Sequence, residues 1–85
     1  MNVSSNKGFN KDYRSLSQKI QEKFKERVVL FEKDQFDPIL NNHLLKGKFL
    51  GYRSINVTGD IRAIFKITGD EVIFVAIDSH SNLYS

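Results

Sequence analysis

The chain has 85 residues, a formal net charge of +3 and no cysteine. This length supports one core, so we expect residues 1–85 to form a single domain. The lack of cysteine excludes disulfide bonds and thiolate metal sites. No apolar run approaches the roughly 18 residues of a membrane-spanning helix, and no signal peptide follows Met1. The sequence therefore predicts a soluble, cytoplasmic protein with no membrane partner.

The positive charge fits two interpretations. An excess of basic residues on so small a surface favours an anionic partner, such as nucleic acid or an acidic protein. A mildly basic domain with no such partner would have the same composition. Charge alone does not separate the two, so the choice depends on motifs.

Apolar residues in the first part of the chain recur in steps of three and four, which is the spacing of a helical stripe. They are Phe9, Tyr13, Leu16, Ile20, Phe24, Val28 and Phe31. Ser15 with Gln18 resembles a capping box, and Ser17 is an alternative N-cap. The pattern predicts two helices, near residues 7–14 and 18–34, packed as a hairpin. The charged residues of the second helix are expected to form a solvated face.

The second half of the sequence has the pattern of strands. Pro38 disfavours a helical conformation at Asp37, so the second helix must end there. Strands are predicted at residues 50–57, 60–67 and 71–78, with a short edge strand at 2–5. Two similar Thr-Gly-Asp turns separate the longer strands. The sequence therefore predicts an α+β fold, a helical hairpin packed on an antiparallel meander sheet of three to four strands.

The length of these turns decides which side chains share a face of the sheet. A two-residue Thr-Gly loop would pair Ile55 with Arg62 and mix apolar and charged residues. A three-residue loop, with glycine in the left-handed conformation, pairs Asn56 with Asp60 and, at the second turn, Lys66 with Asp70. The face expected against the helices then carries Ile55, Val57, Ile61, Ala63, Phe65, Ile67, Ile73, Val75 and Ile77. The face expected to be open carries Tyr52, Ser54, Asn56, Asp60, Arg62, Ile64, Lys66, Val72, Phe74, Ala76, Asp78 and His80.

The predicted open face brings together residues that could cleave RNA. Asp60, Arg62 and His80 share it, and His43 enters from the preceding loop with Lys46 and Lys48 on either side. A base can remove the proton of a ribose 2′-OH, an acid can protonate the leaving 5′-oxygen, and cations can stabilise the charge on phosphorus. Histidine suits either proton transfer near neutral pH, and an aromatic such as Tyr84 can stack on a base.

Each of these residues also has a purely structural interpretation. Asp60 could stabilise its turn, Arg62 could form an exposed ion pair, and His80 could be an ordinary surface histidine. Tyr84 could instead close the end of the core. A metal site formed by His43, Asp60 and His80 is a weaker alternative, because no ligand spacing within one element supports it.

The C-terminal half resembles the RelE/ParE superfamily of toxins, and within it the YafQ-like branch. The resemblance rests on Asn-His-Leu-Leu-Lys-Gly at residues 42–47, on residues 51–54 and 57–65, and on the closing His-Ser-Asn-Leu-Tyr at 80–84. It implies a toxin that cuts messenger RNA on the ribosome, without a metal or other cofactor. It also implies a small acidic antitoxin as partner, with operator DNA bound only through the toxin–antitoxin complex.

By position, the resemblance assigns acid–base roles to His43, Asp60 and His80, and Tyr84 matches the terminal aromatic. From the residues alone, we expect Arg62, Lys46, Lys48 and Tyr84 to contact the substrate. Three departures from the branch stand out. Asn56 replaces a further histidine of some members, Ile61 replaces an aromatic, and Ala76 replaces an arginine that faces the phosphate. Arg62 could supply the missing charge. Two other functions stay open: a ParE-like toxin that acts on DNA gyrase, and a weakly active homologue retained for antitoxin or DNA binding.

Overall fold

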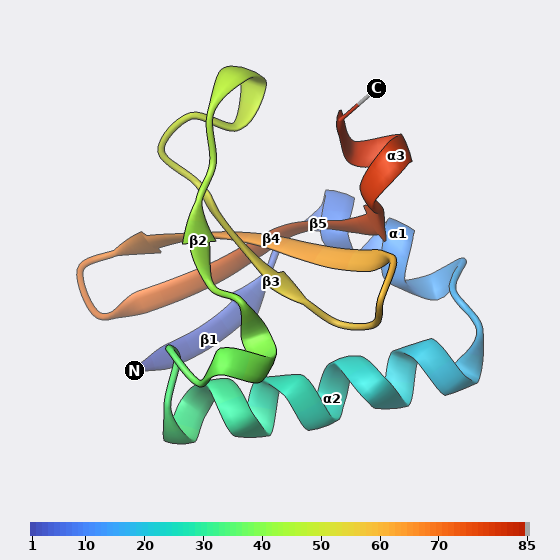
Figure 1. Ribbon diagram of the computed structural model, residues 1–85, viewed down its shortest axis with the longest axis horizontal. Coiled ribbons are helices and arrows are strands. Elements are labelled where there is room, and N and C mark those ends of the chain that lie inside the picture. The colour runs from blue at the N-terminus through green and yellow to red at the C-terminus, as the bar shows by residue number, and fades with distance from the viewer. Residues whose placement is uncertain (85) are drawn as a thin grey trace.

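The computed structural model describes residues 1–84 and contains a five-stranded mixed sheet with helices on both sides (Figure 1). In chain order the elements are β1 (Asn2–Ser5), α1 (Lys7–Arg14), α2 (Gln18–Lys33), the 3₁₀ helix η1 (Pro38–Leu40), β2 (His43–Leu44), the 3₁₀ helix η2 (Gly47–Phe49), β3 (Arg53–Asn56), β4 (Ile61–Thr68), β5 (Glu71–Ser79) and α3 (His80–Tyr84). The strand order is β1-β5-β4-β3-β2, and β1 pairs parallel with β5 whereas the other neighbours are antiparallel. The α+β class, the meander and the edge strand at residues 2–5 are confirmed. The parallel pairing of β1 and the short strand β2 were not predicted.

Both long helices begin where side chains cap them. The Asn6 side chain accepts a hydrogen bond from the Phe9 N–H at 2.8 Å, and the Ser17 hydroxyl accepts one from the Ile20 N–H at 3.3 Å. These bonds satisfy backbone donors that the first helical turn leaves unpaired. The predicted helices are confirmed to within one residue, and Ser17 rather than Ser15 is the N-cap of α2.

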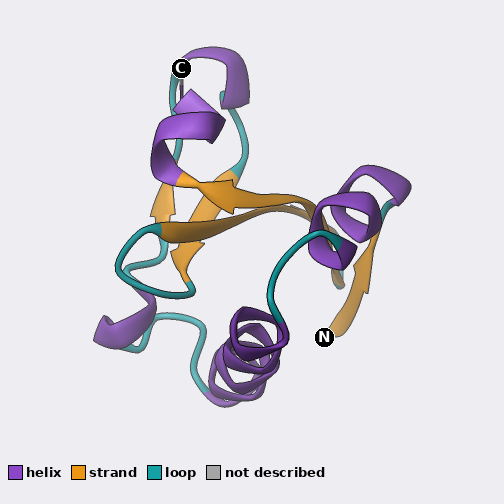
Figure 2. Ribbon diagram, turned by 90° about the vertical axis from the view of Figure 1, so that its right-hand side faces the viewer, coloured by secondary structure: helices purple, strands orange, loops and turns teal. Residues whose placement is uncertain are grey.

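The main core lies between the sheet and the two long helices. Phe31, Phe65 and Phe74 are almost completely buried there, and Phe9 and Phe24 complete a cluster of aromatic rings. Aromatic contacts of this kind add about 0.5–1.5 kcal/mol per pair beyond the burial of apolar area. Figure 2 shows α2 on this side of the sheet and α3 on the other.

A second, smaller core covers part of the face that was expected to be open. Leu45, Ile64 and Leu83 are buried in it, with Tyr52 and Phe49 packed against them. The prediction was wrong on this point because strand alternation was extended to His80. The chain instead leaves the sheet after Ser79 and forms α3, which places Leu83 over Ile64. No helix within residues 1–84 has the length and apolarity needed to span a membrane.

The β3–β4 turn has the predicted length but a different position and conformation. Asn56 pairs with Arg62, and the Val57 N–H donates to the Ile61 carbonyl at 2.9 Å, so the loop is residues 58–60. Gly59 is not in the left-handed conformation, and the Thr58 hydroxyl instead accepts the N–H of Ile61 at 3.0 Å. The pairing differs from the prediction by two residues, so the predicted facing of β3 and of the first half of β4 is unchanged.

The β4–β5 turn differs more from the prediction. This difference changes the face on which the side chains in one half of β5 lie. Thr68 pairs with Glu71, which leaves a two-residue loop with Gly69 in the left-handed conformation at φ 60°. A β-bulge between Ile64 and Phe65 shifts the pairing by one residue, so the part of β5 beyond the bulge has the predicted facing again. As a result, Val72 and Phe74, predicted on the open face, lie in the main core, and Val75, predicted on the covered face, packs against the second core.

Candidate functional site

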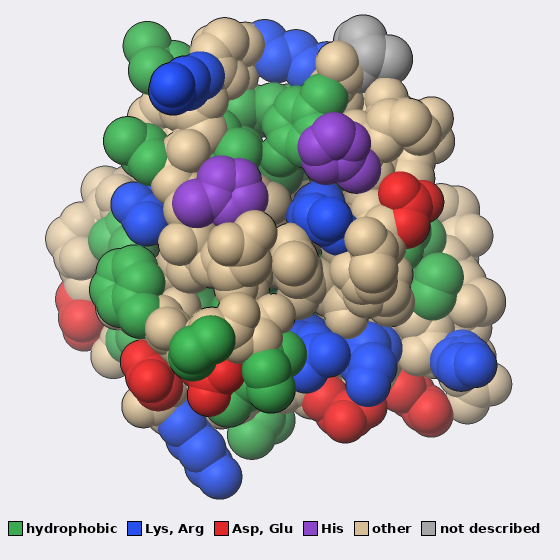
Figure 3. All heavy atoms as spheres, in the orientation of Figure 1, with side chains coloured by type: hydrophobic (Ala, Val, Ile, Leu, Met, Phe, Trp, Pro, Cys, Tyr) green, Lys and Arg blue, Asp and Glu red, His purple; other side chains and the backbone are tan. Residues whose placement is uncertain are grey.

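A polar hollow of about 430 Å³ opens on the face of the sheet that lies opposite α2. Its lining residues are Asn41, His43, Lys46, Arg62, His80 and Tyr84. They come from the loop before β2, from β2, from the residue before η2, from β4 and from α3. Figure 3 shows both histidine side chains on this face, with a basic side chain between them.

His43 is held in a defined orientation by the backbone of Asn41. Its ring Nδ1 lies 2.7 Å from the Asn41 carbonyl oxygen, with which it forms a hydrogen bond. A carbonyl oxygen can only accept, so Nδ1 must carry the proton, and in the neutral ring Nε2 keeps the lone pair. Asn41 adopts the left-handed conformation at φ 47°, which asparagine tolerates better than most residues. The arrangement leaves Nε2 of the neutral ring able to accept a proton.

The loop that carries Asn41 is tied to the sheet by Arg53. The Arg53 Nε donates to the side-chain oxygen of Asn42 at 2.8 Å, and its guanidinium lies 5.6 Å from the centre of the Phe36 ring. Asn42 in turn donates to the Gln35 carbonyl at 2.9 Å. Arg53 pairs with Phe65 of the main core, so Arg53 lies on the covered side of the sheet.

Arg62 lines the hollow together with the two histidines and also supports the β3–β4 turn. Its Nη1 donates to the carbonyl oxygens of Thr58 at 3.0 Å and Gly59 at 3.2 Å. Arg62 pairs with Asn56 on one side and Asp78 on the other. Its predicted facing, away from the main core, is confirmed, and one guanidinium nitrogen is used to hold the turn.

α3 brings His80 and Tyr84 to the other side of the hollow. Their ring centres lie 4.8 Å apart, and Tyr84 also meets Phe49 edge-on at 6.1 Å. The His80 N–H donates to the Asp60 carbonyl at 2.9 Å. The His80 side chain is exposed, whereas Leu83 anchors the helix in the second core.

Two of the predicted site residues do not line the hollow. The Asp60 side chain is exposed on the turn, and its backbone carbonyl, not its carboxylate, is what contacts His80. Lys48 points its Nζ at the Phe49 ring, 5.4 Å from the ring centre. Within residues 1–84, no group of three or more His, Cys, Asp and Glu side chains is arranged to hold a metal ion. His43, Asp60 and His80 therefore do not form the alternative metal set.

Sequence reasoning overlooked Asn41, whose carbonyl orients His43. The sequence feature that could have indicated Asn41 was its position directly after the short Pro38–Leu40 segment. Asparagine is one of the few residues that commonly end a helix in the left-handed conformation. The pairing of Nδ1 with a carbonyl two residues earlier depends on that conformation, so the sequence pattern alone did not indicate it.

Comparison with known proteins agrees with the fold and the resemblance. Residues 1–85 match the family model described as a bacterial toxin of type II toxin–antitoxin system, YafQ. Among solved structures, YafQ from E. coli strain BL21(DE3) is 24% identical, with a TM-score of 0.82 over 99% of this chain and 98% of that one. The E. coli DinJ–YafQ complex matches at 25% identity and a TM-score of 0.79, again over 99% and 98%.

A more distant structure shares the fold. The YoeB/ParE toxin from Agrobacterium tumefaciens is 19% identical, with a TM-score of 0.77 over 94% of this chain and 99% of that one. No curated protein is similar enough in sequence to be matched. The family match covers the whole chain, and the fold agrees with it, so the resemblance to this toxin branch is confirmed. The chain belongs to the YafQ family of bacterial toxins of type II toxin–antitoxin systems.

Proposed function

We propose that this toxin is a ribosome-dependent, metal-independent mRNA endonuclease that inhibits translation in the cytoplasm. The observation that carries the proposal is the polar hollow, whose lining includes His43, His80, Arg62, Lys46 and Tyr84. Two histidines and a fixed cation in one hollow supply a base, an acid and charge stabilisation at one phosphate.

In the proposed reaction, His43 is the base, because its neutral ring keeps the lone pair on Nε2. Nε2 takes the proton of a ribose 2′-OH, and the 2′-oxygen forms a bond to the adjacent phosphorus. The bond from phosphorus to the 5′-oxygen breaks, and protonated His80 gives a proton to that oxygen. Arg62 and Lys46 stabilise the added negative charge, and Tyr84 stacks on a base.

Asp60 and Lys48 keep a place in the proposal, each for a different reason. The Asp60 carbonyl binds the N–H of His80, so Asp60 positions the acid, and a direct proton transfer by its carboxylate stays a prediction. Lys48 adds positive charge close to η2, where a phosphate of the bound strand would pass. Ala76 packs beside the second core and offers no cation, so Arg62 takes that role.

The test is translation in vitro with purified toxin, followed by primer extension on the messenger RNA. We expect discrete cuts that require ribosomes, together with a loss of protein synthesis. At high enzyme concentration, cleavage of free RNA should continue in EDTA, because no metal ion takes part in the proposed step. Intact message combined with inhibited gyrase supercoiling would instead identify a ParE-like activity, and intact message with unaffected gyrase would identify an inactive homologue.

We also propose a small acidic antitoxin as the partner of this chain, as in the E. coli DinJ–YafQ complex. The lysine-rich face of α2 would attract it, and binding to operator DNA would occur through the complex. Co-expression with the neighbouring reading frame should yield a complex that stays intact on size-exclusion chromatography and loses affinity at high salt. A free, non-toxic monomer recovered at high yield from the same cells would contradict this.

A further inference from the structure

We propose that a second hollow, between α2 and the β3–β4 turn, binds the sugar-phosphate backbone of RNA beside the candidate active site. The hollow measures about 390 Å³. Lys23 and Arg27 of α2 form one wall, residues 56–59 form the other, and Ile39 of η1 closes one end. The proposal rests on the proposed function, since it extends the path of the same RNA.

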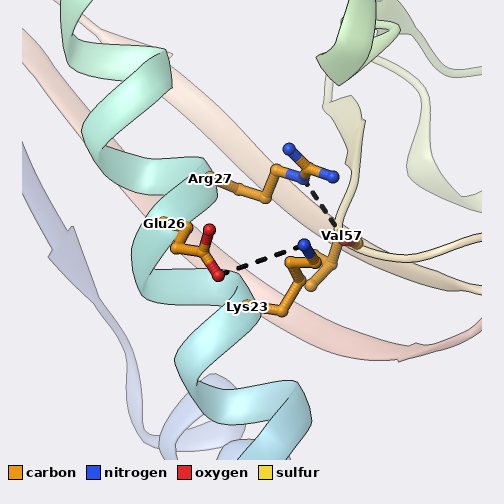
Figure 4. A network of polar contacts seen from close by, with 4 residues as sticks. All are labelled: Lys23, Glu26, Arg27 and Val57. Atoms are coloured by element: carbon orange, nitrogen blue, oxygen red, sulfur yellow. Dashed lines mark hydrogen bonds and ion pairs between the residues drawn. The ribbon is translucent and has the colours of Figure 1, made fainter.

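The α2 wall offers two cations that no strong partner neutralises. Figure 4 shows Lys23 and Arg27 reaching from α2 toward Val57, with Glu26 beside them. Arg27 Nε donates to the Val57 carbonyl at 3.3 Å, which holds the guanidinium at the mouth of the hollow. Lys23 meets Glu26 only at 4.0 Å, and the two side chains are 41% and 68% exposed, so this ion pair has little energetic weight. The predicted solvated face of α2 is therefore partly engaged here.

The opposite wall offers a buried polar atom that lacks a partner. The side-chain oxygen of Asn56 is buried, and no hydrogen-bond donor within the described residues reaches it. Burying an amide oxygen without a donor is unfavourable, so a turn of the Asn56 side chain toward a ligand that supplies a donor would favour that ligand over one that does not. The ribose 2′-OH is such a donor, and it distinguishes RNA from DNA. Two cations and an amide acceptor together match a ribose with its phosphate.

The second hollow is linked to the first through one pair of residues. Asn56, which lines the second hollow, is the cross-strand partner of Arg62, which lines the first. Thr58 and Gly59 also line the second hollow, and Arg62 donates to the carbonyl oxygens of both. An RNA strand that leaves the candidate active site over this turn would meet Lys23 and Arg27 next.

The first experiment measures the affinity of the purified toxin for a labelled single-stranded RNA over a range of salt concentrations. We expect Lys23→Gln combined with Arg27→Gln to weaken binding at least tenfold. The slope of log K against log salt should become smaller by about 1.4, because each phosphate contact contributes about 0.7 for a single strand. The matched control is Lys11→Gln with Lys33→Gln, which removes the same charge from exposed sites and should change the affinity less than threefold.

Two further variants separate charge and hydroxyl recognition from changes in the fold. Arg27→Lys keeps the cation but loses the Nε bond to Val57, so it should bind RNA within about threefold of the wild type. Asn56→Leu removes the amide, so the ratio of RNA to DNA affinity for one sequence should fall several-fold. A melting temperature for every variant identifies any loss of folding, and a variant that melts early is replaced by Lys23→Gln alone.

The outcomes separate this proposal from the proposed function. If the wild type cleaves message and the double variant binds RNA as the control does, the second hollow is not an RNA site, although the nuclease proposal stands. If the double variant loses RNA binding while the wild type cuts no message, the RNA site stands and the nuclease proposal fails. Unchanged RNA affinity with loss of the antitoxin complex would overturn the RNA site in favour of a protein surface. Repeating the titration with ribosomes shows whether ribosomal RNA or the cleaved strand fills the hollow. Weaker binding of the double variant either to free RNA or to ribosomes supports the proposal.

Discussion

Replacing His80 with alanine is expected to lower RNA cleavage by about 10²–10⁴-fold, the usual contribution of a general acid. His80 lines the hollow opposite His43 and can give a proton to a leaving 5′-oxygen near neutral pH, which lysine and arginine do not do readily. The loss should appear both as missing cuts in primer extension and as relief of growth arrest in cells.

The same change should leave the fold largely intact. The His80 side chain is exposed, and its backbone N–H, which binds the Asp60 carbonyl, is kept in the variant. Leu83 continues to anchor α3 in the second core. The lost side-chain contact is the ring of Tyr84 at 4.8 Å, so a fall of a few degrees in melting temperature is the most we expect.

A matched variant distinguishes acid catalysis from orientation of Tyr84. His80→Gln keeps a polar side chain of similar reach but cannot act as an acid near neutral pH, so it should be as inactive as His80→Ala. Tyr84→Phe, which keeps the aromatic ring, should retain most of the activity. A His80→Ala protein that melts normally and cuts RNA at the wild-type rate would remove His80 from the site and leave His43 as the histidine that acts.

The helices and the facing of the central strands could be predicted because local chemistry determines them. Ser17 caps α2 and the apolar stripe faces the core, so the 3.6-residue period is enough to place the helix. For β3 and the first half of β4, a turn placed one residue too early still leaves every side chain on its predicted face. Arg62 was therefore assigned to its face correctly.

The bulge and the end of the last strand could not be predicted from alternation. Val75 and Ala76 lie on one face because the bulge adds a residue to β5, and nothing in this apolar run marks where it occurs. α3 begins at His80 because Leu83 reaches an otherwise uncovered Ile64, which is a long-range contact. The helix brings His80 and Tyr84 to the hollow. The carboxylate of Asp60 stays exposed on the β3–β4 turn and does not line the hollow.

The orientation of His43 depends on the backbone rather than on residue type. The sequence indicated His43 as a candidate, but its tautomer follows from the left-handed Asn41 and from the loop that Arg53 ties down. These contacts link the loop after η1 to β2 and β3, and they depend on backbone geometry that residue type does not give. Residue type alone therefore offered no basis for proposing which histidine is the base.

Arg62→Ala is expected to lower cleavage about a hundredfold or more, whereas Arg53→Ala should mainly lower stability. Loss of one electrostatic contact to the transition state typically costs about 3 kcal/mol, and Arg62 is a cation that lines the hollow with both histidines. Because its Nη1 also holds the turn at Thr58 and Gly59, melting has to be measured on the same protein. Arg62→Lys, which keeps a positive charge, should recover part of the activity.

Arg53 lies on the other face, where its contacts are structural. Its bond to Asn42 and its position over the Phe36 ring should together contribute on the order of 1–3 kcal/mol. In a domain of this size, each kcal/mol corresponds to about 4–8 °C in melting temperature. Arg53→Ala should therefore melt several degrees lower, and its cleavage rate, measured well below the melting temperature, should fall much less than that of Arg62→Ala. If cleavage falls more in Arg53→Ala than in Arg62→Ala, the phosphate contact does not come from Arg62, and the loop that orients His43 controls the rate.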